Sequence, residues 1–76
     1  MNIPYTETHI GTIMVIIDIE YRDGTTLRGV LAHSLEFEPL ENSYNLKVYE
    51  RLEDVYRHKP KLYADVKKIE VVGVRL

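Results

Sequence analysis

The stretch Ile13–His33, IMVIIDIEYRDGTTLRGVLAH, constrains the fold of this chain more than any other part of it. Within it, apolar side chains recur at every second residue: Ile13, Val15, Ile17, Ile19 and Tyr21. A period of two places these side chains on one face of a β-strand, and branching at Cβ suits a pleated, half-buried surface. The alternate residues begin apolar at Met14 and become charged by Asp18. The sequence therefore predicts a strand that runs from the interior toward solvent.

The dipeptide Asp23-Gly24 marks a tight turn after this strand. A two-residue loop would set apolar side chains against charged ones across the hairpin. A three-residue loop, Arg22-Asp23-Gly24, gives the pairs Ile19 with Leu27, Val15 with Leu31 and Asp18 with Arg28. Because register follows from keeping one face apolar, we predict the three-residue loop, in which Gly24 adopts a left-handed conformation. Gly29 then lies opposite Ile17, where a glycine favours a bend or a bulge.

Further elements follow the hairpin. Strands are predicted at Thr25–His33, Leu35–Glu41, Tyr44–Arg51 and Glu70–Val74. The first two of these form either one long strand bent near Ala32–Ser34 or two short strands. Two segments have helical spacing: Leu52–Lys59 favours a helical turn or an irregular loop, and Asp65–Ile69 is compatible with one helical turn. Residues 1–11 contain Pro4 and no period, which favours an extended N-terminal arm.

The length of 76 residues predicts one small domain spanning residues 1–76. A domain of this size buries only about 60% of its unfolded surface, so stability has to come from tight packing or from a partner subunit. The chain has no cysteine, which excludes disulfides and thiolate metal sites. No apolar run approaches the ~20 residues of a membrane span, and no basic-then-apolar leader is present, so we expect a cytoplasmic protein.

Three segments, Ile17–Gly24, Leu27–Leu31 with its G-x-L bend, and the asparagine-led strand Asn45–Val48, resemble Sm-like and SH3-like small barrels. The resemblance covers residues 13–72. It implies an all-β fold: a small, strongly bent antiparallel barrel of about five strands with one short helical turn. It also implies a homo-oligomer and an RNA-binding loop.

The residue types that commonly serve in catalysis do not form an enzyme motif in this chain. The histidines at 9, 33 and 58 lack metal-ligand spacing, and the serines at 34 and 43 lack a nucleophile motif. The four glycines open no phosphate loop. We therefore predict a protein that is not an enzyme and that uses no cofactor and no metal.

One cluster of cationic and aromatic residues favours binding: Arg51, Tyr56, Arg57, His58, Lys59 and Lys61, followed by Tyr63, Lys67 and Lys68. Cations interleaved with tyrosines hold phosphates and stack on bases. The acidic stretch Glu36–Glu41 is expected on the opposite side, which suits head-to-tail assembly. The net charge of −2 opposes general nucleic-acid binding but allows a local basic patch.

The sequence thus predicts a non-catalytic small-barrel binding module, a homo-oligomer that engages RNA, a nucleotide or a protein partner through the basic-tyrosine loop. Two alternatives stay open. One is a small interaction or inhibitor protein, of the kind phages encode, acting on a protein target. The other is an assembly component with no nucleic-acid role.

Overall fold

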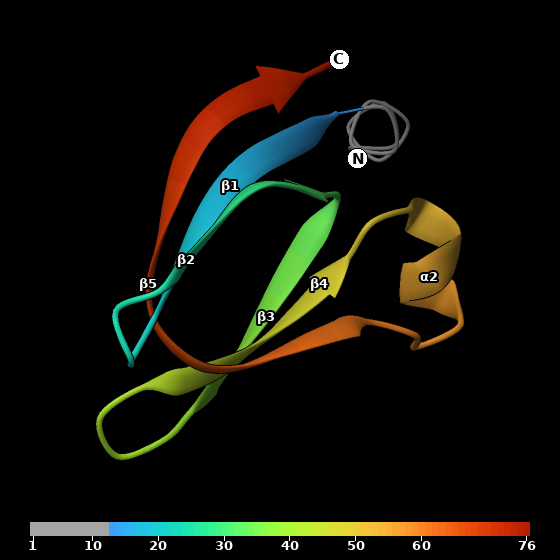
Figure 1. The fold of residues 1–76 in the computed structure, drawn as a ribbon. Coiled ribbons are helices and arrows are strands. Elements are labelled where there is room, and N and C mark those ends of the chain that lie inside the picture. Colours follow the sequence, from blue (N-terminus) through green and yellow to red (C-terminus); the bar gives the residue numbers. More distant parts are fainter. Residues whose placement is uncertain (1–12) are drawn as a thin grey trace, which may run out of the picture.

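Five strands form one antiparallel sheet in the computed structural model, which describes residues 13–76 (Figure 1). The elements are β1 (Met14–Tyr21), β2 (Thr26–Ala32), β3 (Ser34–Pro39), β4 (Tyr44–Tyr49), the short helix α2 (Leu52–Tyr56) and β5 (Lys61–Arg75). The strand order is β2-β1-β5-β4-β3.

The mostly-β fold with one short helix is confirmed, and residues 52–59, for which the sequence allowed a helical turn or a loop, contain the helix α2. The small, strongly bent barrel is not confirmed, because the described strands form one open sheet with β2 and β3 at its edges. The arm predicted over residues 1–11 lies outside the described residues.

The turn between β1 and β2 has the predicted three-residue loop. Ile19 lies opposite Leu27, and the backbone N–H of Tyr21 donates to the carbonyl of Thr25 at 2.8 Å. Gly24 has a φ of 91°, the left-handed conformation that this loop requires. The Asp23 carboxylate accepts hydrogen bonds from the hydroxyl and the backbone N–H of Thr25, and these bonds lower the pKa of Asp23.

A bulge at Gly29 changes the predicted register in the other half of the hairpin. Gly29 has a φ of 76°, and its N–H donates to the Asp18 carboxylate at 3.0 Å. Beyond the bulge Val30 lies opposite Ile17 and Ala32 opposite Val15. The predicted pairs Val15–Leu31 and Ile17–Gly29 are therefore wrong by one residue. The bulge itself was predicted, and it allows Val30 and Ala32 to share the apolar face with Leu27.

Gly29→Ala is expected to lower the free energy of unfolding by about 1 kcal/mol, because an alanine at this φ is strained. No atom lies within 4 Å of the place a Cβ would take, so the loss is conformational and not steric. Gly29→Asn is the matched control, because asparagine adopts the left-handed conformation more readily than alanine does. Urea unfolding measures both variants, and equal losses would show that the left-handed conformation is not the cause.

The core lies on one face of the sheet. Its fully buried side chains are Ile17, Ile19, Ala32, Leu46, Val48 and Val66. Val15 and Tyr21 pack against this cluster, so the prediction that the odd-numbered residues of β1 point inward is confirmed. β1 and β4 contribute alternate residues, as the period of two requires. β5 instead contributes Tyr63, Val66 and Ile69, because the register of its pairing shifts between them.

Strand β5 joins the two halves of the sheet. Its first residues, Lys61 to Val66, pair with β4, and Val66 to Arg75 pair with β1. The strand bends where it changes partner (Figure 1). Asp65 has a φ of 53° at this point, and its backbone N–H donates to the Asn45 side-chain carbonyl at 3.2 Å.

The helical turn predicted at Asp65–Ile69 is wrong. Val66 and Ile69 have helical spacing, but both side chains reach the core from an extended strand. Pairing with β1 from Val66 onward gives this segment partners for the backbone groups on one side of the strand. Tertiary pairing therefore overrides the local pattern.

Candidate binding surface

The six residues predicted to bind lie together around α2 and the loop that leads into β5. We call this surface the cationic corner and define it by Arg51, Tyr56, Arg57, His58, Lys59 and Lys61. All six are exposed to solvent. Figure 1 places α2 at one end of the molecule, beyond the end of β4.

Backbone hydrogen bonds fix the shape of this corner. The Asp54 carboxylate accepts the N–H of Arg51 at 3.2 Å and closes the start of α2. At the other end, His58 has a φ of 53° and its N–H donates to the carbonyl of Val55 at 3.2 Å. The N–H of Lys59 donates to the carbonyl of Asp54 at 2.9 Å. Because the loop satisfies these N–H groups internally, its side chains are left to face solvent.

The cations of the corner are not equivalent. Arg51 is neutralised by its own helix, since its guanidinium lies 2.9 Å from the Glu53 carboxylate and 3.6 Å from that of Asp54. Arg57, Lys59 and Lys61 form no ion pair with any described residue. The available charge is therefore concentrated in the second half of the corner.

An exposed aromatic ring accompanies these cations. The Tyr56 side chain is 75% exposed, and Leu62 beside the corner is 59% exposed. A tyrosine this open offers a face on which a planar group can stack. Tyr63, which the sequence placed in the same cluster, instead packs against the core.

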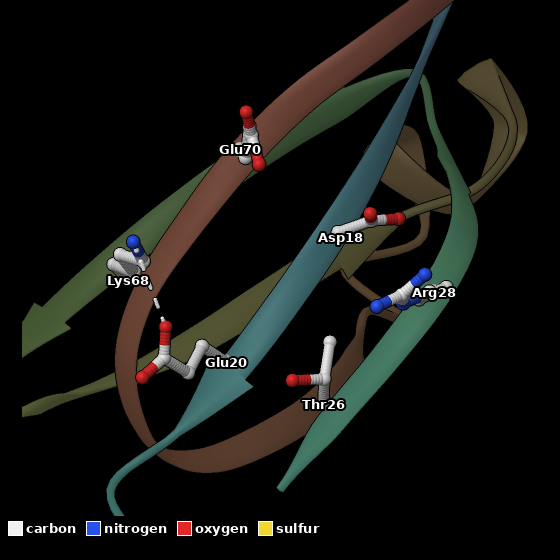
Figure 2. Close-up of a pocket in the computed structure, with 6 residues that line it drawn as sticks. All are labelled: Asp18, Glu20, Thr26, Arg28, Lys68 and Glu70. Carbon is white, nitrogen blue, oxygen red and sulfur yellow. Dashed lines mark ion pairs between the residues drawn. The ribbon is translucent and has the colours of Figure 1, made fainter. Parts of the chain in front are cut away.

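Lys67 and Lys68 lie further along β5 and belong to a different surface. Their ammonium groups are 3.8 and 3.6 Å from the Glu20 carboxylate on β1. This surface includes a shallow depression of about 180 Å³, lined by Asp18, Glu20, Thr26, Arg28, Lys68 and Glu70 (Figure 2). The sequence signal for this depression is the polar face of the hairpin, whose charged residues alternate with the apolar ones, and it was not recognised as a site.

Opposite charges alternate across this depression. Three carboxylates face two cations, and Lys68 is joined to Glu20 (Figure 2). Lys68 and Glu20 neutralise each other, whereas Glu70 and Arg28 form no ion pair with a described residue. Within residues 13–76, no three histidine, aspartate or glutamate side chains are grouped as metal ligands would be.

The acidic stretch lies at the other end of β4 from the corner. The turn between β3 and β4 and the helix α2 are at opposite ends of the molecule (Figure 1). Glu36 accepts a hydrogen bond from the Tyr49 hydroxyl, which raises the pKa of that phenol above its ordinary value. Glu38 accepts a hydrogen bond from the Asn45 amide at 2.9 Å. Asn45, which leads the strand that resembles the asparagine-led strand of Sm-like barrels, is thus held between Glu38 and the backbone of Asp65.

Comparison of the chain with protein-family models, with curated proteins and with solved structures finds no match. In the part of the chain that the structure describes, no helix is long and apolar enough to cross a membrane.

Proposed function

We propose that this chain is a non-catalytic binding module of the small-barrel class, Sm-like or SH3-like. The connection between the two edge strands supports this class. A flat sheet of five strands would hold its edges about 19 Å apart. Yet β2 ends at Ala32 and β3 begins at Ser34, and two Cα steps span at most ~7.6 Å. The two edges therefore approach each other at His33, as consecutive strands do in small barrels.

We further propose that the ligand is single-stranded RNA, held at the cationic corner. The observation that carries this proposal is the group of three cations, Arg57, Lys59 and Lys61, that form no ion pair within residues 13–76 and lie close in sequence to the exposed ring of Tyr56. Lysine and arginine bind phosphates through charge, and an exposed tyrosine stacks on a base of any sequence. The module would hold its ligand without reacting with it.

The overall charge sets the expected mode of binding. Because the net charge is −2, the whole molecule does not attract a polyanion, and contact depends on the corner. Binding should then be local and weak at physiological salt. It should strengthen steeply as the salt concentration falls.

Fluorescence anisotropy with a labelled oligouridylate tests this function. With three phosphate contacts, the logarithm of the association constant should fall against the logarithm of salt with a slope of about −2. A salt-independent affinity, or no binding at low salt, would rule out the RNA function. The exposed side chains of Tyr56 and Leu62 would then favour a protein partner, as expected of an interaction or inhibitor protein.

A further inference from the structure

The C-terminal half of β5 has one edge with which no described strand pairs, and we call it the free edge. Pairing with β4 ends at Val66, whereas pairing with β1 continues to Arg75. From Lys67 to Arg75, β5 therefore has β1 on one side and no described strand on the other (Figure 1). The unpaired backbone N–H and C=O groups of such an edge can pair with another strand.

The side chains along this edge are apolar and exposed. Val71 is 57% exposed, Val72 50% and Val74 60%. Val71 and Val74 lie opposite Ile17 and Val15 of β1, so they are on the face that carries the core. The core face thus runs out to the free edge without a cover from residues 13–76. Exposed β-branched residues on an open edge are unusual in a protein that stays monomeric.

A bulge in β5 makes this edge complementary to itself. Between Ile16 and Ile17 the pairing with β5 shifts by one residue, which leaves Val72 as the extra residue. As a result, Glu70 and Arg75, opposite Asp18 and Met14, point to the same face of the sheet, the one away from the core. In a regular strand residues five apart would point to opposite faces.

We propose that two copies of this chain form a dimer by antiparallel pairing of their β5 edges. The pairing places Glu70 of each copy opposite Arg75 of the other, and Val71 opposite Val74. Both contacts follow from one register, in which charged side chains meet on the outer face and valines meet on the core face. The arrangement is closed by a two-fold axis near Val72 and Gly73, so it makes a dimer and not a fibre.

Charge complementarity selects this partner. Glu70 forms no ion pair with a described residue, and the residue opposite it on β1 is another acid, Asp18 (Figure 2). An arginine from a second copy would neutralise this carboxylate. Arg75 likewise has no acidic partner among the described residues. The pairing does not rest on the RNA function, because the cationic corner lies at the start of β5 and the dimer edge at its end.

Sedimentation equilibrium over a concentration series, with the whole chain, tests the dimer. The wild-type protein is expected to show a monomer–dimer equilibrium. Glu70→Arg and Arg75→Glu are made singly. Each substitution places like charges opposite each other at both symmetry-related contacts and should raise the dissociation constant of the dimer about tenfold or more. The double variant, E70R/R75E, exchanges the two charges and should restore the dimer.

Two controls separate the loss of the dimer from a general effect of charge and from unfolding. Glu50→Arg makes the same charge change at an exposed acid outside the edge and should leave the dimer unchanged. Thermal unfolding by circular dichroism shows that each variant is folded, which is expected because Glu70→Arg replaces a like-charge pair with Asp18 by an opposite-charge pair. A wild-type protein that stays monomeric at every concentration would overturn the proposal. So would a dimer that survives the single reversals, or one that the double variant fails to restore.

Discussion

Ile19→Ala is expected to lower the free energy of unfolding by about 2–5 kcal/mol, enough to leave a large fraction of the molecules unfolded. Ile19 has no exposed surface, and it lies between Leu27 on β2 and Ile69 on β5. Its truncation therefore opens a cavity where three strands meet. The total stability of a domain of 76 residues is about 4–11 kcal/mol, so this single loss is a large part of it.

Leu62→Ala is the matched control for this core truncation. Leu62 is also a branched aliphatic residue in a strand, but its side chain is 59% exposed. Its replacement by alanine should therefore lower the free energy of unfolding by less than about 1 kcal/mol. Urea unfolding followed by circular dichroism measures both variants. If the two variants lose the same stability, Ile19 does not point into the core and the register of β1 is wrong.

The second large effect concerns the cationic corner. Arg57→Glu combined with Lys59→Glu is expected to lower the affinity for oligouridylate about a hundredfold at low salt, because two phosphate contacts become repulsive. Both side chains are exposed, and the loop uses their backbone groups only, so the fold should be unaffected. Fluorescence anisotropy measures the change in affinity.

Two variants separate the corner from general charge. Arg22→Glu reverses one charge, as Arg57→Glu alone does, in the turn between β1 and β2, away from α2, and should alter the affinity little (Figure 1). Arg51→Gln tests the distinction that the structure draws inside the corner. Since Glu53 and Asp54 already neutralise Arg51, its loss should weaken binding far less than the loss of Arg57. If Arg22→Glu lowers the affinity for oligouridylate as much as the double variant does, overall charge governs binding and the cationic corner does not.

The hairpin was predictable because its signals are local. The alternation from Ile13 to Tyr21 indicates which face is buried, and Gly24 fixes the length of the loop. The register beyond Gly29 was not predictable in the same way. Gly29 indicates a bulge, which adds one unpaired residue to β2 and shifts the pairing beyond it. The direction of that shift depends on which side chains of β2 reach the core, and this is not a local property.

The long course of β5 was also hidden from local reasoning. Asp65 in a left-handed conformation and the switch from β4 to β1 depend on contacts with Asn45, twenty residues away in the chain. The residues of the cationic corner, in contrast, cluster because they are close in the sequence: they lie in α2 and in the segments on either side of it. What the sequence did not reveal is that Arg51 is neutralised at the start of α2, since this depends on the geometry of the helix end.

Titration of isotope-labelled protein with oligouridylate, followed by amide chemical shifts, tests the central claim most directly. At low salt, the shifts are expected to concentrate at Tyr56 to Lys61 and to be small along the dimer edge from Glu70 to Arg75. Shifts centred on the depression between β2, β1 and β5, or no shifts at all, would contradict the assignment of the cationic corner as the binding surface.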